Sequence, residues 1–119
     1  MIRCFSLALA VSLFFNASAN AFTDTAAEMI EICHKGETEK MVCQAFIAGV
    51  IYGFVDATEL FRLRNNLENA PNLICPPTTW TVEEGLEILT SWADDNLELL
   101  KYSPSSAVLW AHSKAYPCN

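Results

Sequence analysis

Four cysteines constrain the possible folds of this chain most strongly, because they follow a segment with the pattern of a secretory signal peptide. A basic start at Arg3 precedes an apolar run from Phe5 to Phe15, and Ala17-Ser18-Ala19 is a small-residue cleavage site. The run is shorter than the roughly 20 residues that a membrane-spanning helix needs. We therefore expect residues 1–19 to be removed, with cleavage after Ala21 as the close alternative. An uncleaved N-terminal anchor is the competing interpretation.

Cleavage would remove Cys4 and leave an even set of cysteines in an oxidising compartment. The remaining four are Cys33, Cys43, Cys75 and Cys118. Four cysteines allow three pairings, and the sequence alone does not choose among them. The economical expectation is local pairing, Cys33 with Cys43 and Cys75 with Cys118. By loop entropy these two links contribute ~2.7 and ~4 kcal/mol, which is comparable with the whole stability of a small domain.

The size and charge of the mature chain limit what it can be. Removing 19 of 119 residues leaves 100, so we expect a single domain over residues 20–119. Without Arg3, six basic residues face fourteen acidic ones, a net charge of −8. Nucleic-acid phosphates would repel such a domain, so we expect no nucleic-acid partner. The acids are scattered, which favours simple solvation, and steering toward a basic partner is the alternative.

Helix signals dominate the mature chain and predict an all-α fold, a compact bundle of about four main helices held by two disulfides. The first helix follows the cap Thr23-Asp24-Thr25 and is expected to end at Gly36. The second is expected from about Glu39 to about Leu63, and residues 65–79 are expected to be irregular. Thr81-Val82-Glu83-Glu84 is a capping box that opens the third helix, and Ser103-Pro104 opens the last.

The second predicted helix carries three residues that we expect to be structural. No charge occurs from Met41 through Val55, and apolar residues lie nearly all round, which predicts a central, buried helix. A membrane span is the competing interpretation; we expect none after signal cleavage. Gly49 and Gly53 are four apart and indicate that another helix crosses closely there. Asp56 is expected to pin the next loop through a hydrogen bond, with a partner contact as the alternative.

No arrangement of residues indicates catalysis. His34 and His112 lie near cysteines, but no closely spaced cysteine pair supports zinc, so we predict no metal and no cofactor. An even cysteine count argues against a free thiol nucleophile. His112 is expected to face solvent or to make a structural hydrogen bond. We therefore predict that the protein is not an enzyme.

Two stretches resemble a known family. The segment from Cys43-Gln44-Ala45-Phe46-Ile47 to Val55-Asp56-Ala57 is similar to a pattern that begins C-x-G and ends D-A, with Ala45 in place of the first glycine. Later, Ile74-Cys75-Pro76 and the closing Ala115-Tyr116-Pro117-Cys118 complete the frame. This order of motifs resembles the Rap1a/Tai family of periplasmic immunity proteins, which act against peptidoglycan amidase effectors of type VI secretion. Where the family often has His-Pro, this chain has Asn96-Leu97, so that loop is expected to differ.

The resemblance implies a non-enzymatic, homodimeric helical protein in the periplasm of a Gram-negative cell that presents a loop to the groove of an amidase toxin. Between the last two predicted helices, polar residues and one aromatic are the candidate contacts: Asp94, Asp95, Asn96, Glu98, Lys101 and Tyr102. The irregular segment 65–79 is the other candidate surface. An alternative function is a periplasmic structural or acid-chaperone-like helper that has no toxin partner.

Overall fold

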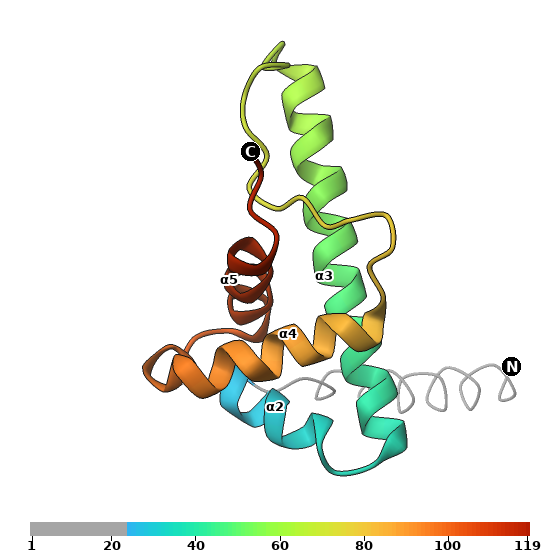
Figure 1. Ribbon diagram of the computed structural model, residues 1–119, viewed down its shortest axis with the longest axis vertical. Helices are drawn as coiled ribbons and strands as arrows, with labels where there is room; N and C mark the ends of the chain where they lie inside the picture. Colours follow the sequence, from blue (N-terminus) through green and yellow to red (C-terminus); the bar gives the residue numbers. More distant parts are fainter. Residues whose placement is uncertain (1–23) are drawn as a thin grey trace, which may run out of the picture.

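The computed structural model describes residues 24–119, and the predicted signal peptide lies outside them. Within this range the chain forms α2 (Ala26–Cys33), α3 (Glu37–Arg64), α4 (Val82–Asp95), the 3-10 turn η1 (Leu97–Leu99) and α5 (Pro104–Ala115), with no strand (Figure 1). The prediction of an all-α fold with four main helices is confirmed.

Side-chain caps open three of the helices, as the sequence predicts. The hydroxyl oxygens of Thr25, Thr81 and Ser103 each accept a backbone N–H from three residues further on, at 3.2–3.3 Å. Pro104 follows Ser103 in the first turn of α5, where a missing N–H costs no hydrogen bond. The N-terminal ends of α2, α4 and α5 are therefore encoded locally.

Gly36 does not end the first helix, so that prediction is wrong. α2 ends at Cys33, and Gly36 precedes α3 with extended backbone (φ −177°). The carbonyls at the end of α2 find other partners: the ring Nδ1 of His34 donates to the Ile30 carbonyl at 2.7 Å, and the Lys35 amide donates to the Ile32 carbonyl at 3.0 Å. These bonds satisfy the helix end without a left-handed glycine.

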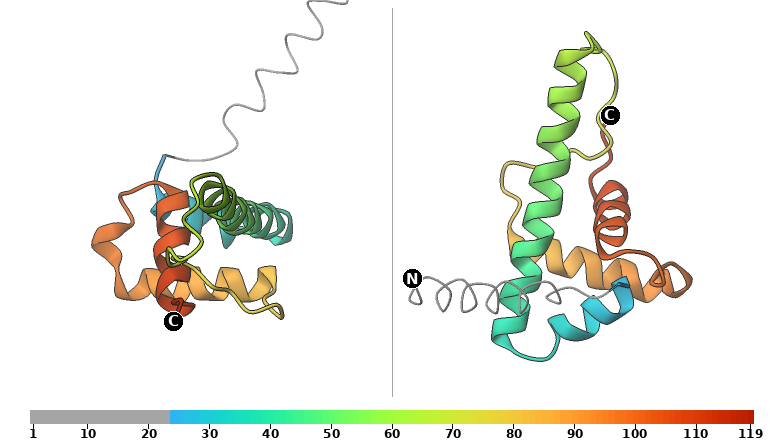
Figure 2. Two further views of the ribbon diagram at one scale, coloured as in Figure 1. Left: turned by 90° about the horizontal axis from the view of Figure 1, so that it is seen from above. Right: turned by 180° about the vertical axis from the view of Figure 1, so that it is seen from behind.

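The long helix α3 is buried along one face only, which corrects the expectation of a helix buried all round. Cys43, Gln44, Ile47 and Ile51 are its buried residues. Leu60, by contrast, is 68% exposed. In the view from above in Figure 2, α4 and α5 lie on one side of α3. One face of α3 stays exposed because the other three helices, of 8, 14 and 12 residues, are too short to surround a helix of 28 residues.

By length and composition, α3 is also the one helix among residues 24–119 that could cross a membrane, with 17% of its apolar window buried. Its inner face nevertheless packs into a core formed with the other helices. The fully buried members of that core include Met29, Ile47, Ile51, Leu89 and Val108. Charged residues lie in the first and the last turn of α3, at Glu37, Glu39, Arg62 and Arg64.

The close approach between helices occurs at Gly85 of α4, which the sequence analysis did not single out. A Cβ there would lie 2.6 Å from Cζ2 of Trp80 and 3.1 Å from Cγ2 of Ile47. The first distance is shorter than a carbon–carbon contact allows and the second is tighter than most, so a side chain at this position would displace Trp80 and press on Ile47.

The crossing predicted at Gly49 and Gly53 is absent from the described chain. Nothing in residues 24–119 lies within 4 Å of a Cβ built at either position, and both residues are exposed. The prediction of a packed glycine pair within the monomer is therefore wrong. The two glycines face away from Ile47 and Ile51, whose side of α3 carries the core.

The two disulfides join Cys33 to Cys43 and Cys75 to Cys118. These are the two local pairs expected from the sequence. The first ties the end of α2 to the first turns of α3. The second ties the segment before α4 to the residues after α5, where the Cys75 amide also donates to the Tyr116 carbonyl at 3.0 Å.

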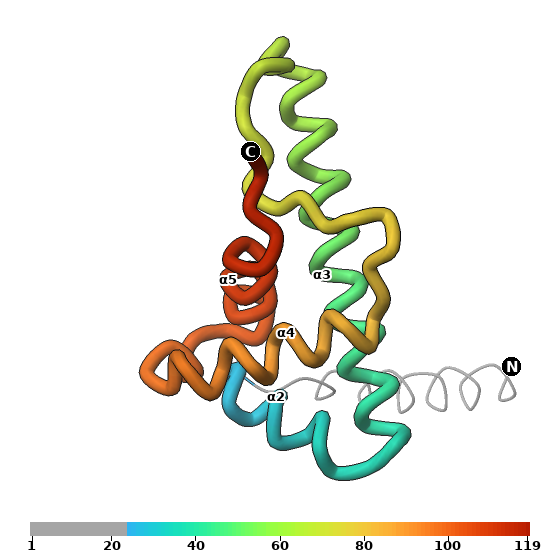
Figure 3. The backbone as a smooth tube through the Cα atoms, in the orientation of Figure 1, coloured from blue at the N-terminus to red at the C-terminus, as the bar shows by residue number. Residues whose placement is uncertain are grey.

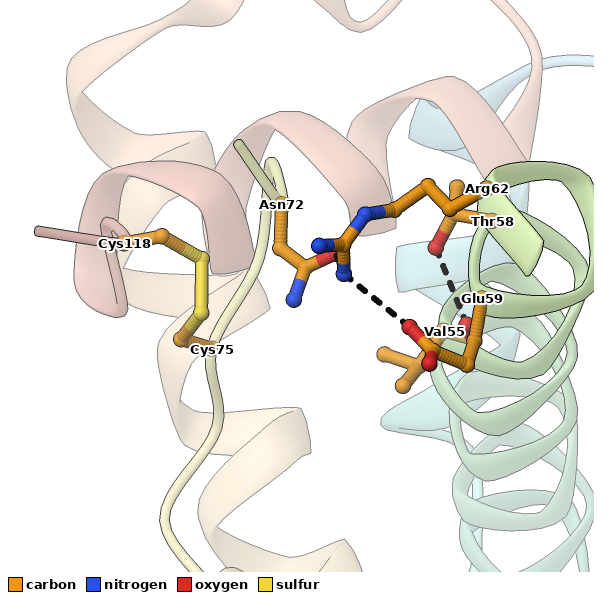
Figure 4. Close-up of a disulfide and its surroundings, with 7 residues drawn as sticks. All are labelled: Val55, Thr58, Glu59, Arg62, Asn72, Cys75 and Cys118. Carbon is orange, nitrogen blue, oxygen red and sulfur yellow. Dashed lines mark hydrogen bonds and ion pairs between the residues drawn. A yellow bond between two sulfur atoms is a disulfide. The ribbon is translucent and has the colours of Figure 1, made fainter. Parts of the chain in front are cut away.

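The segment between α3 and α4 is held by Arg62, not by Asp56. Figure 3 shows this segment turning back beside α3 toward the C-terminal end of the chain. Arg62 pairs with Glu59 on its own helix and donates to Oδ1 of Asn72 in the segment, both at 3.0 Å (Figure 4). Its guanidinium also reaches the carbonyls of Leu67 and Glu68.

Asp56 is exposed and makes no hydrogen bond or ion pair with residues 24–119, so its predicted pinning role is wrong. A carboxylate accepts only, whereas the loop offers carbonyl oxygens that need donors. Arg62, with five N–H groups on its side chain, meets that need from a position six residues further along α3.

Candidate functional site

The predicted contact residues gather at the turn between α4 and α5, residues 94–103, which we call the α4–α5 corner. Five of the six predicted side chains are exposed there: Asp94, Asp95, Glu98, Lys101 and Tyr102. Glu98 lies on η1, and Tyr102 immediately precedes the cap of α5. The corner is therefore a protruding polar surface with one aromatic ring, as expected.

Asn96, the sixth residue, is committed to the fold. It ends α4 and precedes η1, and its side-chain amide donates to the Trp92 carbonyl at 2.7 Å while its backbone N–H donates to Ala93 at 3.1 Å. These bonds satisfy two carbonyls of the last helical turn. Asn96 therefore positions the corner, whereas its neighbours supply the exposed groups.

The corner is fastened from the opposite end of the chain, a feature that the sequence did not reveal. The first amides of α2 have no partner inside their own helix. The Ala26 amide donates to the Tyr102 carbonyl at 2.8 Å, and the Ala27 amide donates to the Leu100 carbonyl at 3.0 Å. Two backbone hydrogen bonds thus tie the start of α2 to the corner and hold the backbone of the corner at Leu100 and Tyr102.

Aromatic rings surround the corner. Tyr102 meets Trp110 edge-on with ring centroids 5.5 Å apart, and Trp110 in turn lies 6.2 Å from Trp92. The ammonium of Lys101 lies 5.3 Å from the centre of the Tyr102 ring. Trp110 is 41% exposed and Leu97 is 69% exposed, so an apolar patch accompanies the acids.

Trp110 and Leu97 were missed as candidate contacts. The sequence does place Trp110 outside the helix face that Ala107, Val108 and Ala111 form, and this position could have indicated that Trp110 is exposed. The three residues of that face are all buried. An aromatic residue next to such a face lies at the edge of the contact between the two helices. The sequence alone did not show that this edge meets the corner.

His112 and Tyr116 make hydrogen bonds that stabilise the fold. His112 is fully buried, its Nδ1 donates to the Val108 carbonyl at 2.8 Å, and burial lowers the pKa of its imidazole below the ordinary value. It therefore makes the structural bond expected of it and does not face solvent. The hydroxyl of Tyr116 donates to Glu84, and this bond raises the pKa of Tyr116 to about 12. Glu84 thus binds the end of α5 and does not complete the capping box.

Residues 24–119 bring together no group of three His, Cys, Asp or Glu side chains that could hold a metal ion. Fold and surface together define a small, disulfide-bonded helical protein with an exposed polar loop flanked by aromatic rings.

The chain belongs to the Rap1a family: the family model described as Rap1a immunity proteins matches residues 25–118. The resemblance seen in the motifs is thereby confirmed. Immunity proteins of this family are inhibitors and not enzymes, in agreement with the prediction. No curated protein and no solved structure matches the chain.

Proposed function

We propose that this chain is a periplasmic immunity protein that binds a secreted peptidoglycan amidase effector and occludes its active-site cleft. Membership of the Rap1a immunity family over residues 25–118 is the observation that carries the proposal. Two disulfides suit an oxidising compartment such as the periplasm. The signal-peptide pattern of residues 1–19 supports the same location.

The α4–α5 corner is the surface that we propose enters the cleft. Occlusion demands an element that protrudes and keeps its shape, because ordering a loose loop on binding reduces affinity. The bonds from Ala26 and Ala27 hold the corner in one conformation before any partner arrives. Exposed Tyr102 and Trp110 are the residue types that most often dominate binding energy at protein interfaces.

The first test measures binding to purified peptidoglycan amidase effectors of type VI secretion by isothermal titration calorimetry. We expect the native chain to bind and Tyr102→Ala to weaken binding at least 30-fold, about 2 kcal/mol, as for a central interface aromatic. The backbone carbonyl that holds Ala26 is kept in this variant, so the fold is preserved.

Phe61→Ala is the matched control, because Phe61 is an exposed aromatic of α3 (60%) far along the chain from the corner. It should bind like the native chain. No binding by the native chain would refute the proposed function, and equal losses in both variants would refute the corner as the contact.

We also propose that two copies of the chain associate through the uncovered face of α3, in line with the homodimer that the family resemblance implies. Val42, Gly49, Gly53, Asp56 and Leu60 follow one another at intervals of three, four or seven residues and so share a stripe. Gly49 and Gly53 have open space above them, which would let a second helix approach closely. Exposed Val42 and Leu60 would supply apolar contact on either side.

Gly53→Leu tests the dimer, because the added side chain would fill the space that close approach requires. In sedimentation equilibrium we expect a dimer for the native chain and a monomer for the variant. Glu83→Leu, which adds the same side chain at an exposed position of α4, should stay dimeric. A native chain that is monomeric at all concentrations, or a dimeric Gly53→Leu, would contradict this interface.

A further inference from the structure

An open groove runs between α4 and α5 beside the corner. Its volume is about 360 Å³, and its lining includes Glu87, Trp92 and Asp95 of α4 and Ala111, Lys114 and Ala115 of α5. Asp95 belongs both to the groove and to the corner, so the two surfaces are continuous. A partner seated on the corner would therefore also lie over the groove.

The groove has an apolar floor. Ala111 and Trp92 are buried at its base, with exposures of 1% and 8%. Ala111 and Ala115 have short side chains that leave room above α5, and Trp92 contributes the small part of its side chain that is not buried. A floor of this kind suits the methylene chain of a long side chain as well as a flat polar group.

The rim of the groove is acidic. Glu87 and Asp95 are eight residues apart on α4, which places them two turns, about 12 Å, apart along one side. Both are exposed, and neither forms an ion pair within residues 24–119. Lys114 lies on the opposite side and leaves an excess of one negative charge.

We propose that this groove receives an arginine side chain of the partner protein, an inference that rests on the proposed function and names the chemistry of its contact. The guanidinium is planar, stacks on indole rings and forms paired hydrogen bonds with carboxylates. Its methylenes would lie on Ala111 and Ala115, and its head would reach Asp95 beside Trp92. Lysine lacks the planar head, and a neutral side chain would leave the carboxylates unpaired.

The first arm of the test uses N-acetylarginine amide as the probe and N-acetylcitrulline amide, its uncharged isostere, as the control. In proton–nitrogen NMR of the full chain, arginine amide should shift the Trp92 indole and the Ala111 and Ala115 amides saturably, with a Kd of about 1 mM by ligand-efficiency limits. Citrulline amide should bind at least tenfold more weakly. Equal effects of both probes, or shifts scattered over other acidic surfaces, would overturn the proposal.

The second arm uses the amidase effector that the native chain binds in calorimetry and the double variant Glu87→Gln/Asp95→Asn. Calorimetry should show at least tenfold weaker binding and a smaller dependence on salt. Glu28→Gln/Glu31→Gln removes the same charge from exposed α2 positions and should bind like the native chain. Unchanged binding by the groove variant would overturn the arginine site alone, whereas no binding by the native chain would refute the proposed function and leave the first arm to decide the groove.

Discussion

Removing the Cys75–Cys118 disulfide should lower the free energy of unfolding by about 4 kcal/mol, because the bond closes a loop across 43 residues of the unfolded chain. The double variant Cys75→Ala/Cys118→Ala isolates this effect, since Cys75 is exposed and Cys118 is half-buried, so that little packing is lost. Urea unfolding followed by circular dichroism gives the free energy directly.

The control for this variant is Thr79→Ala/Ser91→Ala, two exposed positions with small side chains. Each change there should alter stability by no more than about 0.5 kcal/mol. A loss below about 1 kcal/mol in the cysteine variant would contradict the role that we assign to the bond. The slope of the unfolding free energy against urea concentration should rise in the cysteine variant, because the unfolded chain without the cross-link exposes more surface.

Ile47→Ala should destabilise the protein by about 2–5 kcal/mol, the range for truncating a fully buried aliphatic side chain. Ile47 has no exposed surface and touches the region where Gly85 and Trp80 meet α3. The close approach of α4 leaves the backbone little freedom to collapse into the space, so the cost should fall in the upper half of this range.

Leu60→Ala, on the same helix, tests whether α3 buries one face alone. Leu60 is 68% exposed, so its truncation should change the stability of the monomer by less than about 0.5 kcal/mol. Thermal and urea unfolding at low protein concentration make this comparison. Similar losses for both variants would mean that α3 is covered on both sides, against the one-sided packing described above.

The helix starts were predictable because their determinants lie within a few residues. Thr25, Thr81 and Ser103 each cap the helix that follows. Such caps require no knowledge of how the helices are placed in space. The disulfide pairs agree with the economical expectation, since each joins cysteines that are neighbours in the order of the chain, but the sequence alone left the two other pairings open.

The errors concern α3, where the answer depends on what surrounds the helix. An apolar run from Met41 to Val55 is compatible with cover on every side, and only the placement of α4 and α5 shows that one side remains open. The same reasoning misplaced the tight contact at Gly49 and Gly53, because glycine spacing does not show which face has a neighbour.

The candidate site was found in part. Its polar residues lie close together in the sequence, between the last two predicted helices, and so could be identified as one exposed turn. Trp110, the bonds from Ala26 and the groove beneath Asp95 come from three other segments, and only the tertiary structure brings them together. Rigidity of the corner was likewise invisible, since it arises from backbone amides that carry no residue-specific signal.

The unequal spans of the two cross-links have a consequence for biosynthesis. Cys33 and Cys43 emerge almost together, whereas Cys118 emerges only after α5. A growing chain therefore passes through a stage in which the first disulfide joins α2 to α3, both faces of α3 are exposed, and Cys75 is still a free thiol because Cys118 has not been made. Protection from aggregation and from wrong oxidation is needed most during that interval, so we expect production of this protein to depend on folding helpers more than its small size suggests.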